Sequence, residues 1–425
     1  MIKHAWFRTT LAVAVASASC QLMANGLAIN EQSVSGMGTG FAGRSSSAQD
    51  ASTVFGNPAG MSRLERAEIS GGFAAIKAST DIGSASPNPA TGTNLVQGTN
   101  EGDIAPEAAV PFAYYVRPLN DKWHFGLGFY VPFGVISDYE KSSQGRDLGL
   151  YSKVQVMTLQ PTLSYRINDR IAIGFGPTIN KIEGKLTSQP LAVTGSDATV
   201  NIKGDDIGYG FNVGVLVDVT DRLAWGLTYH SKVDYELEGR TRFAGFPAPL
   251  RGNYDATLDF TSPESADTSI TYTANDKWTL YAGATWTRWS QLKEIEAINE
   301  GMHPGLGGQY DTVGEELNWE NSWSYAVGVA YQLNPAWVLR GGFTMDESPT
   351  NNADRTVRIP VSNRKIVSLG AGWNINHDWT MDFAYSYLRE SKGRVDQTNH
   401  STGTNYSAEY RNSAHGAGVQ LTHRF

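Results

Sequence analysis

The residues suited to acid–base, nucleophilic or metal chemistry are thinly spread along this sequence of 425 residues. Its eight histidines are scattered, and no group of His, Cys, Asp and Glu has the spacing of a metal site. The sequence contains neither a Gly-x-Ser-x-Gly elbow nor a glycine-rich phosphate loop. We therefore expect a protein that is not an enzyme and that needs neither a cofactor nor a metal.

The composition favours a β protein. It includes 45 Gly, 19 Tyr, 16 Phe and 11 Trp, and only 18% of the residues are charged. The net charge of −8 argues against nucleic acid as a partner. Soluble and membrane-embedded β proteins share such a composition, so the class has to be decided by periodicity along the chain.

Residues 1–24 have the pattern of a secretory signal peptide. Lys3 and Arg8 provide a positive start, Leu11–Ala16 an apolar middle, and Ala24 a small residue at a cleavage site. The apolar run is far shorter than the roughly 20 residues of a membrane-spanning helix, and no later segment approaches that length. The only cysteine, Cys20, lies within the signal, so we expect an exported mature chain without disulfides.

Six short turn signals recur along the chain, 42 to 59 residues apart. Asn, Asp and Pro favour tight turns because they adopt or preset the required backbone angles. Each interval fits one strand, a longer loop and a returning strand, which predicts fourteen strands in total. The turns are Asn120-Asp121-Lys122, Asn168-Asp169-Arg170, Thr220-Asp221-Arg222, Asn275-Asp276-Lys277, Asn334-Pro335-Ala336 and Asn376-His377-Asp378.

The strand after each turn alternates with the sheet period of two. In one of them Trp278, Leu280 and Ala282 share a face opposite Thr279 and Tyr281. Tryptophan opens four of these strands, which predicts an aromatic girdle at one membrane interface. A soluble β-sandwich would also alternate but has no reason to repeat Trp at this place. The four residues are Trp123, Trp278, Trp337 and Trp379.

We therefore predict an all-β fold over residues 65–425, a 14-stranded antiparallel transmembrane β-barrel in the outer membrane of a Gram-negative bacterium. Its surroundings would be outer-membrane lipid and lipopolysaccharide, and we expect a monomer. The last strand alternates up to the terminal Phe425. Such an end resembles the signal that the barrel assembly machinery reads.

Residues 25–64 do not alternate and are rich in Gly and Ser. They are either a loose periplasmic leader or an N-terminal hatch plugging the lumen, because small residues permit close backbone packing. We take the hatch as the leading interpretation.

Several motifs, in order along the mature chain, resemble the long-chain fatty-acid outer-membrane transporter family, FadL, which includes members that take up aromatic hydrocarbons. The resemblance implies a fourteen-stranded barrel with a hatch, through which hydrophobic molecules diffuse to a lateral opening. It makes Asn57, Pro58 and Ala59 the hatch motif. The motifs are Asn25–Gly38, Asn57-Pro58-Ala59, Trp289-Ser290-Gln291, Asp346-x-Ser348-Pro349, Arg355, Ile359-Pro360 and Arg364.

Pro132, Phe133 and Gly134 end an otherwise regular third strand. Proline cannot donate to the strand ladder, and glycine bends freely. The family has an inward kink in this strand, so the resemblance makes these residues the lateral opening. The alternative is that the strand prolines lie beyond the paired zone or at harmless bulges.

The resemblance also implies binding residues for a hydrophobic ligand with a carboxylate, which needs an apolar pocket and cations. Leu27 and Ile29 on the hatch match pocket positions, Arg355 and Arg364 match motif arginines, and Lys181 lies on the fifth strand. For each arginine the alternative is a solvated surface charge.

The alternation of side chains along the predicted strands places two charged residues on the inward face. These are Arg340 and Asp382, at the fourth positions of strands eleven and thirteen. Inward charges in a plugged barrel usually pair with one another or with the plug, so we interpret them as structural anchors.

The leading functional hypothesis is passive uptake of long-chain fatty acids through a lateral opening. The nearest alternative is uptake of aromatic or other neutral hydrocarbons by the same route. A general porin would need an open charged lumen, whereas the predicted inward faces are rich in Gly, Thr and Tyr. A surface adhesin is disfavoured by short predicted outer loops.

Overall fold

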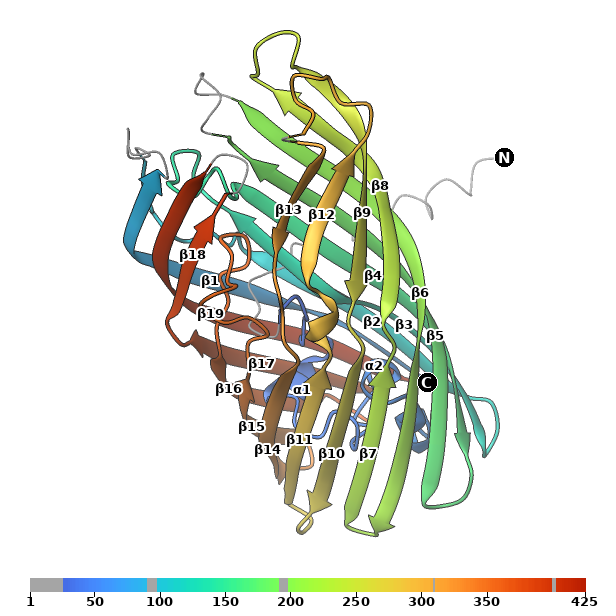
Figure 1. The fold of residues 1–425 in the computed structure, drawn as a ribbon. Helices are drawn as coiled ribbons and strands as arrows, with labels where there is room; N and C mark the ends of the chain where they lie inside the picture. The colour runs from blue at the N-terminus through green and yellow to red at the C-terminus, as the bar shows by residue number, and fades with distance from the viewer. Residues whose placement is uncertain (1–25, 90–97, 191–197, 309, 400–402) are drawn as a thin grey trace, which may run out of the picture.

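The structure is a computed structural model that describes residues 26–89, 98–190, 198–308, 310–399 and 403–425. The predicted signal peptide lies outside these residues. Most of the described chain forms one antiparallel sheet, which closes where β1 (Glu68–Pro89) pairs with β19 (Thr404–Arg424). Figure 1 shows the resulting barrel, with the short helices α1 and α2 inside it. Among the described residues, no helix has the length and apolar character needed to cross a membrane.

Nine of the barrel strands are continuous in the described chain. They are β1, β2 (Ala108–Pro118), β3 (Trp123–Asp138), β4 (Tyr151–Arg166), β5 (Ile171–Ser188), β6 (Thr199–Thr220), β15 (Trp337–Asp346), β16 (Arg364–Asn374) and β19.

The other five barrel strands are each interrupted once, so the nineteen described segments make fourteen strands, as predicted. The first three are β7 (Leu223–His230) with β8 (Val233–Ala244), β10 (Ser265–Thr273) with β9 (Gly252–Ser262), and β11 (Trp278–Thr287) with β12 (Glu294–Asn299). The last two are β14 (Ser322–Asn334) with β13 (Thr312–Glu316), and β17 (Trp379–Glu390) with β18 (Gly393–Thr398). The 3-10 turn η2 (Trp289–Gln291) stands in the break between β11 and β12.

All six predicted turns join neighbouring strands. In each, a side-chain oxygen of the first residue accepts hydrogen bonds from the backbone two and three residues later. Asn275 Oδ1 accepts from the amides of Lys277 at 2.9 Å and Trp278 at 3.1 Å. Thr220 Oγ1 plays the same part with the amides of Arg222 and Leu223. This local bonding explains why the strand count could be predicted.

The predicted alternation is also confirmed. Trp278 and Leu280 are 44% and 46% exposed on the outer face, whereas Tyr281 between Leu280 and Ala282 is buried inside. The tryptophans that follow the turns stack on aromatic neighbours of the next strand, as Trp337 does on Trp373 with parallel rings 5.6 Å apart. They form the aromatic girdle at the turn end of the barrel.

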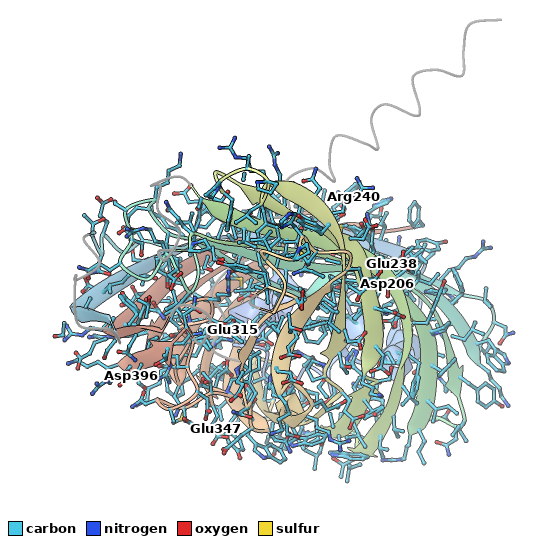
Figure 2. The ribbon with its side chains drawn as sticks, turned by 45° about the horizontal axis from the view of Figure 1, so that its top comes forward. Asp206, Glu238, Arg240, Glu315, Glu347 and Asp396 are labelled. Carbon is cyan, nitrogen blue, oxygen red and sulfur yellow. The ribbon has the colours of Figure 1, made fainter. Side chains whose placement is uncertain are left out.

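At the strand breaks the outer face of the barrel changes from apolar to charged. Below the breaks the outer face is mainly apolar, and at the breaks it becomes charged, for example where Arg288 Nη1 lies 2.9 Å from Glu264 Oε1. Above them, charged side chains such as Asp206, Glu238 and Arg240 on β6 and β8 cover the outside (Figure 2). The breaks therefore lie near the outer edge of the apolar band that faces lipid.

The N-terminal segment (residues 26–64) lies inside the barrel and contains α1 (Val34–Gly38), α2 (Thr53–Gly56) and the 3-10 turn η1 (Pro58–Arg63). Its contacts reach around the wall: α1 packs on β16, β17 and β19, and η1 on β4, β5 and β6. Inward-facing glycines make room for it. A Cβ atom at Gly370 would lie 2.7 Å from the Gly38 Cα, and one at Gly174 would lie 2.5 Å from the Ala59 amide nitrogen.

The contact at Gly174 yields a prediction about stability. Because backbone of η1 occupies the space that a Cβ atom would need, Gly174→Ala should destabilise the protein by about 1–3 kcal/mol through overpacking. Thermal unfolding of the purified protein in detergent measures this. The matched control is Gly341→Ala, since a Cβ atom there would meet nothing closer than 3.8 Å. Equal melting temperatures for the two variants would contradict the packing account.

Candidate functional site

The wall of the barrel is interrupted where β3 leaves β2. The β2–β3 ladder runs from Pro118–His124 to Ala113–Phe129 and ends there. On its other side, β3 shifts register against β4, so that Val131 and Pro132 lie opposite the single residue Met157. This extra residue is a β-bulge, which bends the strand.

Beyond the bulge, β3 pairs with the N-terminal segment in place of β2. The Ile29 amide donates to the Pro132 carbonyl at 2.9 Å, and the Gly134 amide donates to the Leu27 carbonyl at 2.8 Å. The Gln32 side chain adds a bond from Nε2 to the Val131 carbonyl at 2.6 Å. Pro132 has no amide hydrogen, so its only backbone bonding group, the carbonyl, is satisfied here.

The consequence is a gap between β2 and β3. In the described pairings, residues 108–112 of β2 pair with β1 alone. The wall closes again higher up, where the Asp138 amide donates to the Ile104 carbonyl at 2.7 Å. Pro132, Phe133 and Gly134 lie beside this gap.

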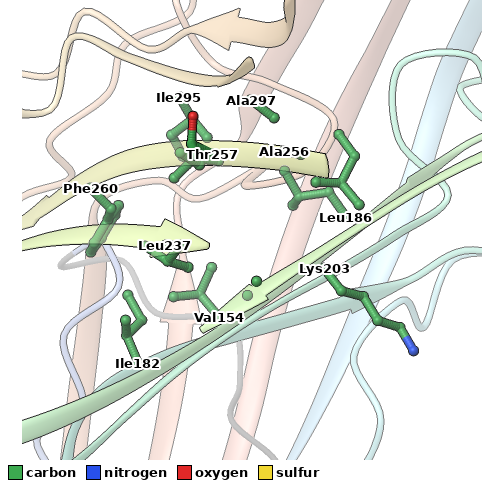
Figure 3. Close-up of a pocket in the computed structure, with 14 residues that line it drawn as sticks. Val154, Ile182, Leu186, Lys203, Leu237, Ala256, Thr257, Phe260, Ile295 and Ala297 are labelled. Atoms are coloured by element: carbon green, nitrogen blue, oxygen red, sulfur yellow. The ribbon is translucent and has the colours of Figure 1, made fainter. Parts of the chain in front are cut away.

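An apolar cavity of about 540 Å³ lies in the upper lumen. Figure 3 shows its side chains, and the one charged residue among them, Lys203, points away from the others. The cavity is lined by Val154, Ile182, Gly184, Leu186, Ile202, Lys203, Gly204, Leu237, Ala256, Thr257, Leu258, Phe260, Ile295 and Ala297.

A second cavity, of about 820 Å³, lies beside the kink and includes Pro132 and Phe133 in its lining. It is more polar than the first, with Arg44 and Asp267 also facing it. Tyr235 lines the second cavity and Phe260 the apolar cavity, and the centroids of their rings are 6.3 Å apart.

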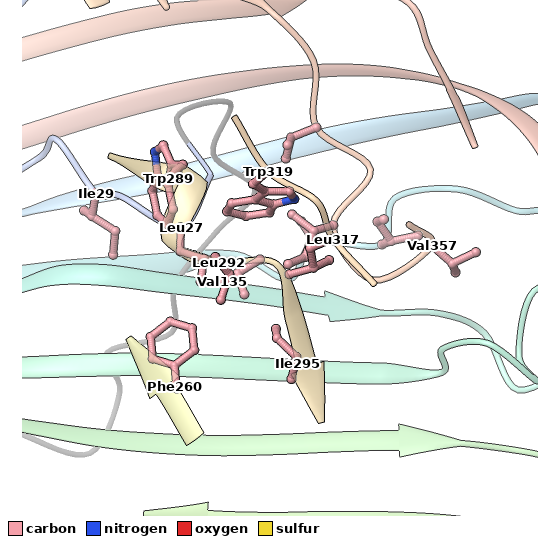
Figure 4. Packing of buried hydrophobic residues seen from close by; sticks show 14 of the residues in the cluster. Leu27, Ile29, Val135, Phe260, Trp289, Leu292, Ile295, Leu317, Trp319 and Val357 are labelled. Atoms are coloured by element: carbon pink, nitrogen blue, oxygen red, sulfur yellow. The ribbon is translucent and has the colours of Figure 1, made fainter. Parts of the chain in front are cut away.

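The start of the N-terminal segment is held between two tryptophans. A Cβ atom at Gly26, whose φ is +61°, would lie 2.7 Å from the rings of both Trp289 and Trp319, so only glycine fits. The two rings meet edge to face with centroids 5.0 Å apart. Figure 4 shows Leu27 beside this pair; it is fully buried, whereas Ile29 is 3% exposed and lines the second cavity.

The mouth of the barrel forms a wide vestibule. It shares Leu186, Ile202 and Ile295 with the apolar cavity, so the two spaces adjoin. Two guanidinium groups, Arg355 and Arg358, face the vestibule. Six acidic residues also lie around it: Asp147, Glu296, Glu315, Glu316, Asp354 and Asp396. By strand alternation the side chains of Glu296, Glu316 and Asp396 lie on the outer face.

Both vestibule arginines are bound to the protein. Arg355 Nε donates to the Val361 carbonyl at 2.6 Å, and Arg358 Nη1 donates to Ser152 Oγ at 3.0 Å. Burial lowers the pKa of the Arg358 guanidinium, and the Glu315 carboxylate opposes that shift. This balance of charge makes the vestibule a poor site for an anion.

The other two predicted cations are not placed to hold a ligand in the lumen. Arg364 Nη2 lies 2.6 Å from Asp346 Oδ2, with side chains only 1% and 0% exposed, so its charge is already compensated. Lys181 lies on the outer face of β5, where it pairs with Glu183 at 2.9 Å. The assignment of Lys181 to a ligand pocket is therefore wrong, because its alternating position on β5 directs it away from the lumen.

Arg340 and Asp382 face inward and pair with each other. Arg340 Nη1 lies 2.6 Å from Asp382 Oδ1, and the side chains are 8% and 3% exposed. The Arg340 side chain also lies next to Gly38 of α1. The pair thus joins two barrel strands beneath the N-terminal segment.

The Asn57-Pro58-Ala59 motif docks the N-terminal segment on the wall. Asn57 Nδ2 donates to the carbonyls of Ser45 at 2.6 Å and Val215 of β6 at 2.9 Å. Its Oδ1 accepts from the Ala59 amide at 3.0 Å, which caps η1. All of its polar atoms are therefore used structurally.

Sequence reasoning missed Arg44, and it missed the ring pair of Tyr235 and Phe260. A signal for Arg44 was present, because it is the one cation between Arg8 and Arg63. No signal marked Tyr235 and Phe260, since they meet only through the pairing of β8 with β9.

Known proteins resemble this chain in sequence and in fold. The sequence model of the outer membrane protein transport protein family (OMPP1/FadL/TodX) matches residues 15–425. A putative outer membrane protein of Neisseria meningitidis serogroup B is 29% identical over all of both chains. A long-chain fatty acid transport protein of Escherichia coli O6:H1 is 28% identical over 96% of each chain.

Two solved structures share the fold. A Pseudomonas aeruginosa FadL homologue superposes with a TM-score of 0.84 at 24% identity, over 94% of this chain and 100% of the other. The Pseudomonas putida toluene transporter TodX gives 0.68 at 17% identity, over 96% and 100%.

Proposed function

This chain belongs to the OMPP1/FadL/TodX family of outer-membrane transport proteins, and on that premise we propose that it takes up long-chain fatty acids by passive diffusion. It is a transporter for hydrophobic compounds in the outer membrane and not an enzyme. The choice of substrate and the route are the parts that we propose.

The observation that carries the proposal is the apolar cavity inside a barrel whose wall is interrupted nearby. Its lining is almost entirely apolar, as in sites that bind hydrophobic small molecules. Burying a hydrocarbon chain there removes apolar surface from water at roughly 25 cal/mol per Å². A long-chain fatty acid supplies such a surface together with one polar end.

The proposed route enters at the vestibule, continues into the apolar cavity and passes Tyr235 and Phe260 into the second cavity. It ends at the gap beside Pro132, Phe133 and Gly134, where the substrate leaves sideways into the outer leaflet. We propose that residues 25–64 act as the hatch that blocks a straight path through the barrel of residues 65–425, after removal of the signal at residues 1–24. Diffusion into lipid needs no energy source.

Uptake of aromatic or other neutral hydrocarbons is the second candidate. One observation favours it: among the described residues, no cation is directed into the apolar cavity. A neutral ligand needs no counter-charge in the cavity and is not repelled by the carboxylates of the protein. The toluene transporter with this fold is consistent with that possibility.

The lateral route is tested by straightening β3. Replacing Pro132-Phe133-Gly134 with Thr-Val-Thr restores amide donors and β propensity, so we expect β3 to pair with β2 and close the gap. Uptake of radiolabelled oleate by cells that lack their own transporter should fall to background. Pro161→Thr in β4 is the control, because Pro161 lies within a paired register. Normal uptake by a folded Thr-Val-Thr variant would rule out this exit.

The apolar cavity is tested by filling it. Ala256 lines the cavity and is 5% exposed, so Ala256→Trp should occupy the space of the hydrocarbon chain. We expect the oleate affinity of the purified protein to fall at least about tenfold, which is roughly 1.4 kcal/mol. Ala75→Trp, at an exposed position on the outer face of β1, is the control. Unchanged oleate affinity in Ala256→Trp would place the substrate elsewhere.

A further inference from the structure

One guanidinium inside the barrel stands apart from the others. Arg44 lies in the N-terminal segment and lines the second cavity, near Pro132 and Phe133. It also lines a smaller cavity of about 470 Å³ within the N-terminal segment itself. Arg44 is therefore placed at a junction of two spaces beneath the proposed route.

Arg44 is held by neutral groups. Its Nη2 donates to Asn30 Oδ1 at 2.9 Å. Its guanidinium carbon lies 5.1 Å from the ring centroid of Phe41 and 5.9 Å from that of Phe55. The two aromatic rings favour the cation and fix its position.

Other arginines of the lumen already have a counter-charge. Arg63 pairs with Asp218, Arg340 with Asp382, and Arg364 with Asp346. Among the ion pairs of the described residues, none includes Arg44. A guanidinium carries five N–H donors in a planar fork, which suits a carboxylate. The bond to Asn30 uses one of them, so the group retains capacity for an anion from outside the chain.

Four other titratable groups face the second cavity: Asp267, His230 and the phenols of Tyr130 and Tyr235. Asp267 is 6% exposed; its Oδ2 accepts from Thr285 Oγ1 at 2.6 Å, and its Oδ1 has no partner in the described structure. The His230 ring packs on Phe55 at 5.0 Å. Asp267 would repel an anion, so it favours a head group bound at the Arg44 side of the cavity.

We propose that Arg44 binds the carboxylate of the fatty acid in the second cavity, with the hydrocarbon chain extending past Tyr235 and Phe260 into the apolar cavity. This inference rests on the proposed function and names the residue that distinguishes a fatty acid from a neutral hydrocarbon. It accounts for an apolar cavity without a cation, because head and tail occupy different spaces. It also places the head group directly beside the kink in β3.

The test compares two ligands with the same chain, oleate and the neutral oleyl alcohol. Their affinities for the full-length protein in detergent are measured by isothermal titration calorimetry. For Arg44→Gln we expect oleate binding to weaken roughly 10- to 100-fold, the range for a hydrogen bond to a charged group. Oleyl alcohol binding should change less than about twofold, since it does not use the charge.

Three variants sharpen this comparison. Arg44→Lys keeps a charge and should retain part of the oleate affinity. Asp267→Asn removes the repelling carboxylate and should strengthen oleate binding without affecting the alcohol. Arg411→Gln, at an exposed site on β19, is the matched control and should change the affinity for neither ligand.

The outcomes separate this inference from the proposed function. If the unmodified protein binds neither oleate nor the alcohol, the proposed uptake of fatty acids is contradicted. Suppose instead that the unmodified protein binds oleate. If Arg44→Gln then leaves the oleate affinity unchanged, or lowers the affinities for oleate and the alcohol equally, only the role of Arg44 is contradicted. Arg44→Lys serves the same comparison if Arg44→Gln does not fold.

Discussion

The structure depends on one constraint, the need to pair every backbone N–H and C=O at membrane depth. A barrel strand that leaves its neighbour would normally leave these groups unpaired in lipid. Here β3 leaves β2 because the backbone of Leu27 and Ile29 takes over the bonds of Pro132 and Gly134. The N-terminal segment therefore supplies backbone partners for β3 where β3 no longer pairs with β2.

The same segment is fixed by the barrel in return. Asn57 bonds to the β6 backbone, and inward glycines such as Gly174 leave space for η1. At its other end, Gly26 is confined between Trp289 and Trp319. The segment, the kink in β3 and the cavities thus depend on one another, which supports the proposed hatch and the proposed sideways route. That arrangement suits molecules that are soluble in the membrane they are delivered to.

The sequence predicted what depends on local bonding and alternation. In each turn an Asn or Thr side chain accepts hydrogen bonds from the backbone amides two and three residues later. Because both partners lie within four residues, such a turn can be recognised from a single sequence. Alternation likewise placed Arg340 and Asp382 inside, where they pair. Whether an arginine is free to bind a ligand depends on contacts between residues distant in the sequence. The charge of Arg364 is compensated by Asp346 across β15 and β16, and a single sequence does not reveal this pair. Alternation along β5 places Lys181 on the outer face, so the strand period already argues against a pocket position for it.

The central claim is that substrate leaves through the gap between β2 and β3. The most direct measurement is photo-crosslinking with a diazirine-bearing fatty acid, followed by peptide mass spectrometry of the labelled full-length protein. The account predicts adducts on both edges of the gap, at residues 108–112 of β2 and 131–135 of β3. Adducts confined to the lower end of the N-terminal segment, around Arg63 and Leu64, would contradict it and indicate a path straight through the barrel.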